Sequence, residues 1–316
     1  MASKNSSIKK TQKPILAEGV WEKRAAKAVW ADNVAALAAL NPPVKADSLI
    51  RLNEGQATPE PALVVAARAS SLGVVQWLLK NALDEGIGIA SIKTKTGRTP
   101  LIEAADEGCE AVLGALLPHS DARAADESGN TALTLAAIGG HDSMTLKLLP
   151  ASDAMARDNG GNTALMFAAV NTRPETIQAV LAASDAKAMN DDQQSAITMA
   201  AYWGKVDSVR ILAPHSDLGA RDSNGHTVFE VTMADAISGE KFMLNSAKWE
   251  IVDFLAPSQP RARIDELFAV AGAQKMPQWA ALLEAETLAE ELGVRLKENS
   301  AAPAPQRGAG VSARRV

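Results

Sequence analysis

The sequence of 316 residues lacks the features that mark a disulfide-bonded or membrane-spanning protein. Its single cysteine, Cys109, excludes an internal disulfide and fits a reducing compartment. No stretch approaches the ~20 apolar residues that a membrane helix needs, and the apolar segment 15–17 is too short for the core of a signal peptide. The sequence therefore predicts a cytoplasmic protein with no membrane span.

Aromatic residues are also scarce. They make up 4% of the chain, whereas hydrophobic residues make up 47%, with alanine the dominant apolar type. This composition favours many close contacts between small side chains over one large aromatic core. Length alone would suggest about two globular domains, but a repeat array is not bound by that rule.

Acidic residues are missing from both ends of the chain. Residues 1–15 carry four lysines and residues 301–316 carry three arginines, within a formal net charge of -5. The body between them is therefore acidic, which argues against a nucleic-acid-binding surface and against a specific nucleic-acid partner. We expect both ends to be basic, disordered tails.

The strongest signal is an internal repeat of 32 residues. The segment Gly-Asn-Thr-Ala-Leu occurs at 129–133 and again at 161–165, and related segments lie one period before and one and two periods after. A Ser-Asp pair keeps the same period, with its aspartates at Asp121, Asp153, Asp185 and Asp217. Five consecutive units in register indicate a repeat architecture.

Each unit carries the signals of two short helices joined by turns. In one unit, residues 126–129 supply turn residues, Thr131 is a candidate N-cap, and 133–137 place apolar residues on one helical face. Gly140 is expected in the left-handed conformation that ends the first helix, and Pro150 stops the second. The equivalent glycines are Gly108 and Gly204, and the equivalent prolines are Pro118 and Pro214.

At these residues the chain resembles the ankyrin-repeat family, with Thr99-Pro100-Leu101, Ala104-Ala105, Gly108 and Leu116-Leu117 matching the family pattern. The resemblance covers about residues 93–230 and implies an all-α repeat solenoid of helix-turn-helix units with hairpin-like loops. Two departures stand out. Each unit is one residue shorter than the usual ~33, and Thr172 replaces the periodic glycine, so the turn at 171–174 should be reshaped.

Divergent units extend the array in both directions, to roughly eight in all. A degenerate helix pair is expected at 21–40, a longer exit loop near 84–96, an insertion around 238–248 and a last helix pair at 267–283. The predicted organisation is a basic tail (1–15), an N-terminal capping unit (16–60), ankyrin repeats (61–235), divergent C-terminal capping helices (236–300) and a second basic tail (301–316).

No motif predicts catalysis, a cofactor or a metal. Residues 86–88 have two glycines but lack the third glycine and the following helix of a phosphate-binding loop. His119 and His215 occupy the same place in units three apart, so they cannot ligate one zinc ion. Cys109 begins a helix, where a thiol can become reactive, but a plain small packing residue is the favoured interpretation.

The resemblance implies a concave binding face built from the hairpin tips and the outer ends of the first helices. The expected partner-binding residues are Asp106, Glu107, Glu127, Asn130, Ile138, Asn159, Asn162, Val170, Asn171, Asp191, Gln194, Tyr202, Trp203, Ser223 and His226. The residues Trp30, Trp77, Trp249 and Trp279 are expected to pack. The aromatic pair Tyr202 and Trp203 is the expected anchor for a partner, and the competing hypothesis is that Trp203 packs between units.

The predicted function is a non-catalytic, monomeric scaffold that binds another protein. An alternative is a bacterial effector or toxin-neutralising protein of the immunity type, secreted without a classical signal peptide. An enzyme with its site in the C-terminal part has little support, because residues 256–300 contain neither histidine nor cysteine.

Overall fold

The computed structural model describes residues 18–50, 58–238 and 242–259. The chain divides into two compact units, Met1–Leu255 and Ala256–Val316. The first holds all the α-helices and strands described below, and the described part of the second begins with a 3₁₀ turn at Ala256–Ser258. The predicted helix pair at 267–283 and both predicted tails lie outside the described residues.

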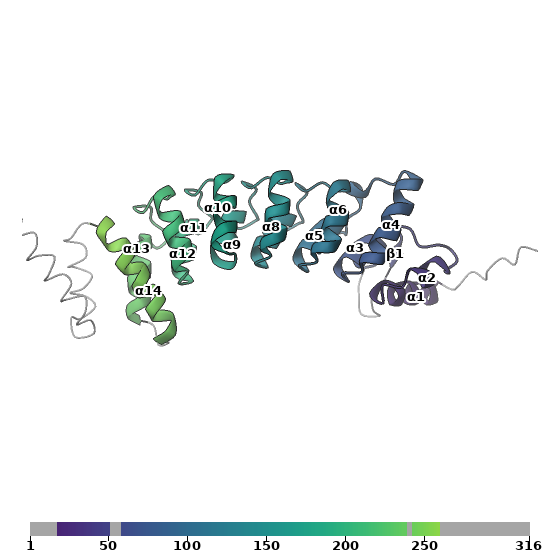
Figure 1. Ribbon diagram of the computed structural model, residues 1–316, viewed down its shortest axis with the longest axis horizontal. Helices are drawn as coiled ribbons and strands as arrows, with labels where there is room; N and C mark the ends of the chain where they lie inside the picture. The colour runs from purple at the N-terminus through teal and green to yellow at the C-terminus, as the bar shows by residue number, and fades with distance from the viewer. Residues whose placement is uncertain (1–17, 51–57, 239–241, 260–316) are drawn as a thin grey trace, which may run out of the picture. The chain divides into compact units, whose positions relative to one another are not determined.

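Paired helices follow one another along the first compact unit (Figure 1). The pairs are α1 (Glu18–Trp30) with α2 (Val34–Ala38), α3 (Ala62–Arg68) with α4 (Leu72–Glu85), α5 (Pro100–Asp106) with α6 (Glu110–Leu116), α7 (Ala132–Ile138) with α8 (Asp142–Leu148), α9 (Ala164–Asn171) with α10 (Pro174–Ala182), α11 (Ala196–Tyr202) with α12 (Val206–Leu212), and α13 (Val228–Ser238) with α14 (Phe242–Leu255). The first helix of each pair contacts the first helix of the next, and the second helices do the same. The predicted all-α repeat solenoid is confirmed.

The core repeats with the sequence. Leu101, Leu133, Leu165 and Ile197 are fully buried at the same position of successive first helices. Burying each such side chain contributes about 1.5–3 kcal/mol, whereas helices this short are marginal alone in water. Alanines such as Ala136 are also fully buried and let neighbouring helices approach closely. Stacking of small side chains therefore replaces an aromatic core.

The predicted helix signals are present. Thr131 caps α7, because its hydroxyl accepts a hydrogen bond from the Thr134 backbone NH while the Thr134 hydroxyl accepts one from the Thr131 NH. Gly108, Gly140 and Gly204 follow the first helices with φ of 70°, 67° and 66°. The second helices α6, α8 and α12 end in 3₁₀ turns that contain Pro118, Pro150 and Pro214.

The turn that lacks glycine is reshaped as predicted. Helix α9 runs to Asn171, Thr172 is extended rather than left-handed, and α10 begins at Pro174. Asp142 of the preceding unit compensates: its Oδ1 accepts from the Arg173 NH at 2.9 Å and from the Thr176 hydroxyl at 2.7 Å. The start of α10 is thus capped by a neighbouring unit.

Two expectations were wrong and one element was missed. The predicted long exit loop near 84–96 is shorter than expected, because Asp84 and Glu85 belong to α4. Helix α4 has 14 residues whereas the equivalent helix α6 has 7, so part of the extra length of this unit extends a helix. Trp30 is 55% exposed rather than packed. Strands β1 (Leu49–Ile50) and β2 (Glu60–Pro61) pair antiparallel, which no sequence signal had indicated. The domain boundaries stay predictions.

Candidate functional site

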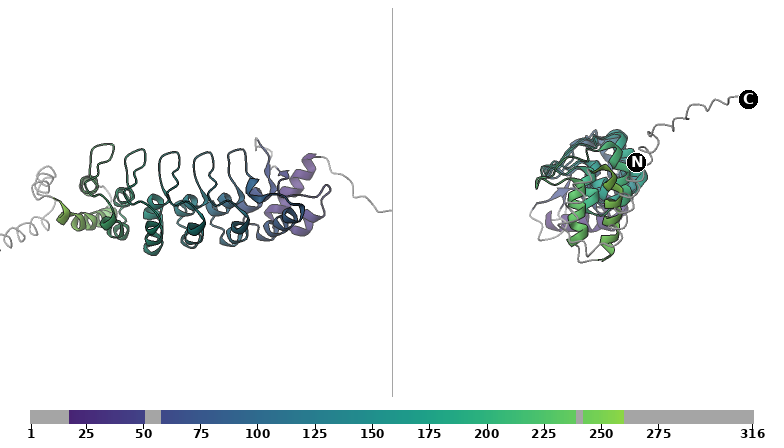
Figure 2. Two further views of the ribbon diagram at one scale, coloured as in Figure 1. Left: turned by 90° about the horizontal axis from the view of Figure 1, so that it is seen from above. Right: turned by 90° about the vertical axis from the view of Figure 1, so that its left-hand side faces the viewer.

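The hairpin tips between units form a continuous row, which Figure 2 shows as loops side by side. Each tip donates one backbone hydrogen bond to the tip before it: Glu127 NH to the Thr96 carbonyl (2.9 Å), Asn159 NH to Ser128 (2.9 Å), Asp191 NH to Gly160 (3.0 Å) and Ser223 NH to Asp192 (3.2 Å). We call residues 127–128, 159–160, 191–192 and 223–224 the tip row. Because each tip is bound to its neighbour, the row presents its side chains from an ordered backbone.

In three of the tips the aspartate that opens the turn, Asp126, Asp158 or Asp222, serves the hairpin rather than the solvent. Oδ1 of Asp126 accepts hydrogen bonds from the NH groups of Ser128 and Asn130, both at 2.9 Å. Asp158 does the same for Gly160 and Asn162. These carboxylates replace missing backbone partners inside the turn. In the tip row the Asn159 amide is engaged as well, since it donates to the Glu127 carbonyl at 2.9 Å.

Left-handed residues close each hairpin. Gly129 has φ 79°, and a Cβ placed on it would lie 2.9 Å from Cα of Asp158, so the next tip leaves no room for a side chain. Gln193 occupies the equivalent position of the tip at 191–192, with φ 57°. A non-glycine residue there carries a backbone conformation that costs about 1–2 kcal/mol.

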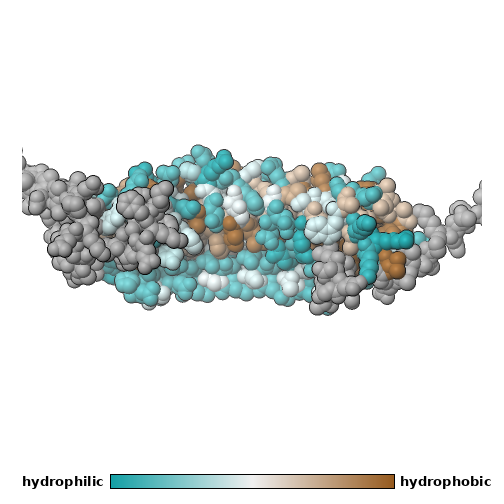
Figure 3. Space-filling view, turned by 90° about the horizontal axis from the view of Figure 1, so that it is seen from below, coloured by the Kyte–Doolittle hydropathy of each residue, from teal (hydrophilic) through white to brown (hydrophobic). Residues whose placement is uncertain are grey.

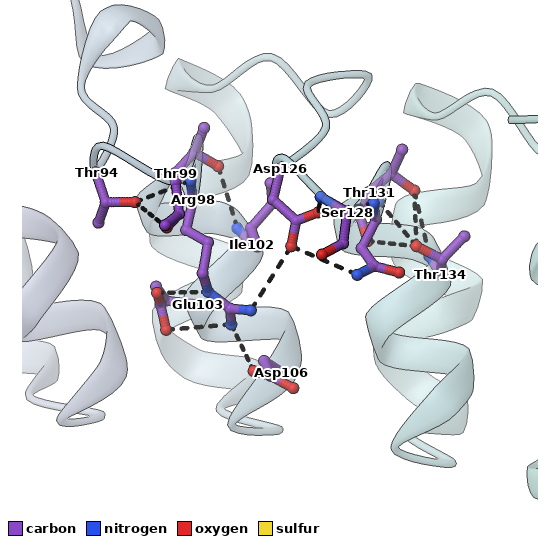
Figure 4. Close-up of polar contacts among 12 residues, drawn as sticks. Thr94, Arg98, Thr99, Ile102, Glu103, Asp106, Asp126, Ser128, Thr131 and Thr134 are labelled. Carbon is purple, nitrogen blue, oxygen red and sulfur yellow. Dashed lines mark hydrogen bonds and ion pairs between the residues drawn. The ribbon is translucent and has the colours of Figure 1, made fainter. Parts of the chain in front are cut away.

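A buried ionic network joins the units of α3 and α5, and Figure 4 shows its part around Arg98, Glu103, Asp106 and Asp126. The carboxylate of Glu103, 2% exposed, accepts from Arg68 at 2.7 and 3.0 Å and from Arg98 at 2.7 and 3.3 Å. Burial alone would raise the pKa of Glu103, but the hydrogen bonds and charges of the two guanidinium groups outweigh it and hold this pKa below its usual value. The third nitrogen of the Arg68 guanidinium, Nη1, donates to Oε2 of Glu60 at 2.6 Å.

Arg98 also reaches two further acids. It donates to Asp106 at the end of α5 and lies 3.8 Å from the Asp126 carboxylate on the next hairpin. Asp106, an expected partner-binding residue, is therefore already paired with a cation. Sequence reasoning missed the network, although the signal was present. Arg98 stands where the other units have Asn, Gln or His, and Glu103 stands where they have Leu, Phe, Met or Val.

A second row runs along the ends of the first helices. Its members Ile138, Val170, Tyr202 and Trp203 form what we call the apolar strip. Ile138 is 39%, Tyr202 50% and Trp203 54% exposed, and Val170 is half-buried. Figure 3 shows apolar patches along the middle of one face beside a band of hydrophilic atoms. The competing hypothesis that Trp203 packs between units is wrong.

The two aromatic rings of the strip support each other. Tyr202 and Trp203 lie edge to face, with centroids 5.7 Å apart and an interplanar angle of 86°. The ammonium of Lys248 on α14 lies 5.4 Å from the Tyr202 centroid, a cation–π contact. These contacts fix an exposed aromatic surface at the end of α11.

The structure divides the expected partner-binding residues into two exposure classes. Exposed are Asp106, Glu107, Glu127, Ile138, Asn159, Asn171, Asp191, Tyr202, Trp203, Ser223 and His226, and half-buried are Asn130, Asn162, Val170 and Gln194. The half-buried amides line the inner side of the tips, where the Asn190 amide donates to Asn162 Oδ1 at 2.8 Å. None of the expected residues is fully buried.

The described residues hold no group of three or more His, Cys, Asp or Glu side chains that could hold a metal ion. Within the same residues, every buried side-chain nitrogen or oxygen has a hydrogen-bond partner. Over this part of the chain, no helix has the length and apolarity required to cross a membrane.

Comparison with known families gives a match over residues 112–190 to the family described as Ankyrin repeats (3 copies). The matched stretch begins within α6 and ends at the hairpin that precedes α11. Comparison with curated proteins gives no match.

Proposed function

We propose that this ankyrin-repeat protein binds another protein through the surface formed by the tip row and the apolar strip. Ankyrin repeats are generally protein-interaction modules, and the family is typically non-catalytic. The observation that carries the proposal is the exposed Tyr202–Trp203 pair, which stands on the same face as Ile138. Aromatic side chains of this kind dominate binding energies at protein interfaces.

The backbone supports binding as well as the side chains. The hydrogen bonds between successive tips, such as Asn159 NH to Ser128, hold the tip row in place before any partner arrives. Binding to a pre-ordered surface costs less conformational entropy than binding to mobile loops. The exposed carboxylates of Glu127 and Asp191 favour a partner with basic residues around an apolar centre.

We also propose that the protein acts as a cytoplasmic monomer with no catalytic step of its own. Its only cysteine, Cys109, is unpaired and half-buried, as suits a reducing compartment. Ankyrin fold alone does not select a partner, so partner identity must come from experiment.

A photo-crosslinking residue placed at Tyr202 tests the proposal inside cells. The matched control is the same residue at Met155, which is 58% exposed but lies outside the tip row and the apolar strip. We expect an adduct with one specific protein at position 202 and none at position 155. The absence of any adduct at 202, or identical adducts at both positions, would contradict the proposal.

A further inference from the structure

Charges of opposite sign lie on the two sides of the apolar strip. In the unit of α11, Asp191 and Asp192 precede the helix. Tyr202 is the last residue of the helix, Trp203 follows it, and Lys205 comes directly after the turn at Gly204. Since the helix runs from its hairpin tip to its turn, the order along its axis is acid, apolar strip, base.

The neighbouring units each supply one half of this order. Glu127 lies on the tip before α7, which ends at Ile138, and Arg173 lies in the turn after α9, which carries Val170. The side chain of Arg173 is 81% exposed even though its Nε lies 3.4 Å from Asp142. Over the three units together, the exposed acids Glu127, Asp191 and Asp192 lie on the tip side of the strip, and the bases Arg173 and Lys205 lie on its turn side.

The acids on the tip side are open to a partner. Glu127, Asp191 and Asp192 are exposed and make no ion pair with any residue that the structure describes. Two exposed arginines lie beside the same tips and are held against the hairpins: Arg157 donates to the Met189 carbonyl at 2.6 Å, and Arg221 donates to the Gly225 carbonyl and lies 3.2 Å from the Glu230 carboxylate.

The spacing of the strip selects a helix as its occupant. Packed neighbouring helices lie about 8–10 Å apart, which sets the step from Ile138 to Val170 and from Val170 to Tyr202. On a helix laid across them, residues i, i+7 and i+14 share one face and lie about 10.5 Å apart. In an extended strand, residues about 10 Å apart are three positions apart and point to opposite faces.

We propose that the surface takes one amphipathic helix of a partner protein, laid across α7, α9 and α11. Apolar side chains at heptad spacing contact the apolar strip, a basic flank faces Asp191, Asp192 and Glu127, and an acidic flank faces Lys205 and Arg173. This inference rests on the proposed function and adds the secondary structure and charge pattern of the partner.

A display library tests this pattern without knowledge of the natural partner. One helix of a small helical scaffold is randomised on its surface and selected for binding to the full chain. A parallel library of unstructured peptides of the same length is selected in the same way. We expect the helical library to be enriched in sequences with apolar residues at heptad spacing, basic residues on one flank and acidic residues on the other.

Single substitutions in the full chain then test the apolar and the charged contacts separately, by their effect on binding of the selected helices. Trp203→Ala and Asp192→Lys should each weaken the selected helices about tenfold or more, which corresponds to about 1.4 kcal/mol. Asp84→Lys, the same charge change at the exposed end of α4, is the control and should leave binding within about twofold. Circular dichroism of each variant shows whether the fold is intact.

Three results would overturn the inference. One is enrichment of helices whose two flanks carry the same charge, and a second is equal binding by Asp192→Lys and Asp84→Lys. The third is enrichment only in the unstructured library, or in neither. A failure here together with a specific adduct at position 202 leaves the proposed function standing, whereas the absence of that adduct removes both.

Discussion

At the hairpin tips, one absent side chain decides how closely two neighbouring units approach. Gly129 and Gly225 have nearly the same φ, 79° and 82°. A Cβ on Gly129 would lie 2.9 Å from Cα of Asp158, whereas a Cβ on Gly225 meets nothing within 4 Å among the described residues. The two positions therefore separate backbone strain from contact between tips.

The first prediction uses this matched pair. Gly225→Ala should lower the free energy of unfolding by about 1–2 kcal/mol, since alanine resists the left-handed conformation. Gly129→Ala carries the same strain and must also displace the next tip, which adds about 1–3 kcal/mol. Urea denaturation measures both losses, and equal losses would show that the tips are not in tight contact.

The second prediction concerns Trp203 alone. Because its side chain is 54% exposed, Trp203→Ala should change the free energy of unfolding by no more than ~0.5 kcal/mol. Loss of a tryptophan from a core would cost ~3–5 kcal/mol. A loss of that larger size in urea denaturation would place the ring inside the array and contradict its role as an anchor.

At the scale of elements, contacts between distant residues decide how neighbouring units join. Arg68 of α3 binds Glu103 of α5 across 35 residues of sequence, and Asp142 of α8 caps the start of α10. In both cases one unit supplies a partner that the next unit lacks. The junctions are therefore specific even though the units are alike.

The third prediction tests the Glu103 network. Glu103→Gln should lower the free energy of unfolding at pH 7 by ~1.5–3 kcal/mol, because it removes the charged acceptor of two half-buried guanidinium groups, which keep Glu60 and Asp106 as partners. Its matched control is Glu110→Gln, at an exposed ion pair between α6 and α8, where solvent screening should make the loss much smaller. Equal losses in urea denaturation would contradict a structural role for the network.

The fourth prediction follows from the lowered pKa of Glu103. A carboxylate whose pKa is lower in the folded than in the unfolded state stabilises the fold above its ordinary pKa of 4.5, and this contribution is lost as pH falls through the folded value. The intact chain should therefore lose more stability between about pH 5 and pH 3 than Glu103→Gln does. Urea midpoints at the two pH values give the difference, and equal slopes would contradict the assignment.

The helix pairs were predictable because their signals are local and periodic. Thr131, Gly140 and Leu133 act within one unit, and the 32-residue period places each of them again in the next. The ionic network was not predictable, since it depends on which side chains of different units meet. The expected site residues were largely exposed for the same local reason, yet only the structure shows that Asp106 is already paired.

At the scale of the whole first compact unit, Met1–Leu255, each helix pair contacts only the helix pairs of adjacent repeats over most of the array. Stability in such an array is approximately a sum of unit and junction contributions. Local damage should therefore spread to adjacent units before it reaches distant ones.

The fifth prediction follows from these contacts. Leu165→Ala removes a fully buried side chain from α9 and should cost ~2–5 kcal/mol. Hydrogen exchange of the folded protein should show the largest loss of protection in α7, α9 and α11, with less in α3. A uniform loss from α3 to α13 would indicate one all-or-none unit instead.

The central claim is that the face carrying the tip row and the apolar strip binds a protein. Its most direct test is the dissociation constant of the protein crosslinked at position 202, measured by calorimetry for the intact chain and for Trp203→Ala. We expect Trp203→Ala to bind about 30-fold more weakly, since truncating an aromatic anchor typically costs ~2 kcal/mol. Equal dissociation constants for the two chains would contradict the claim.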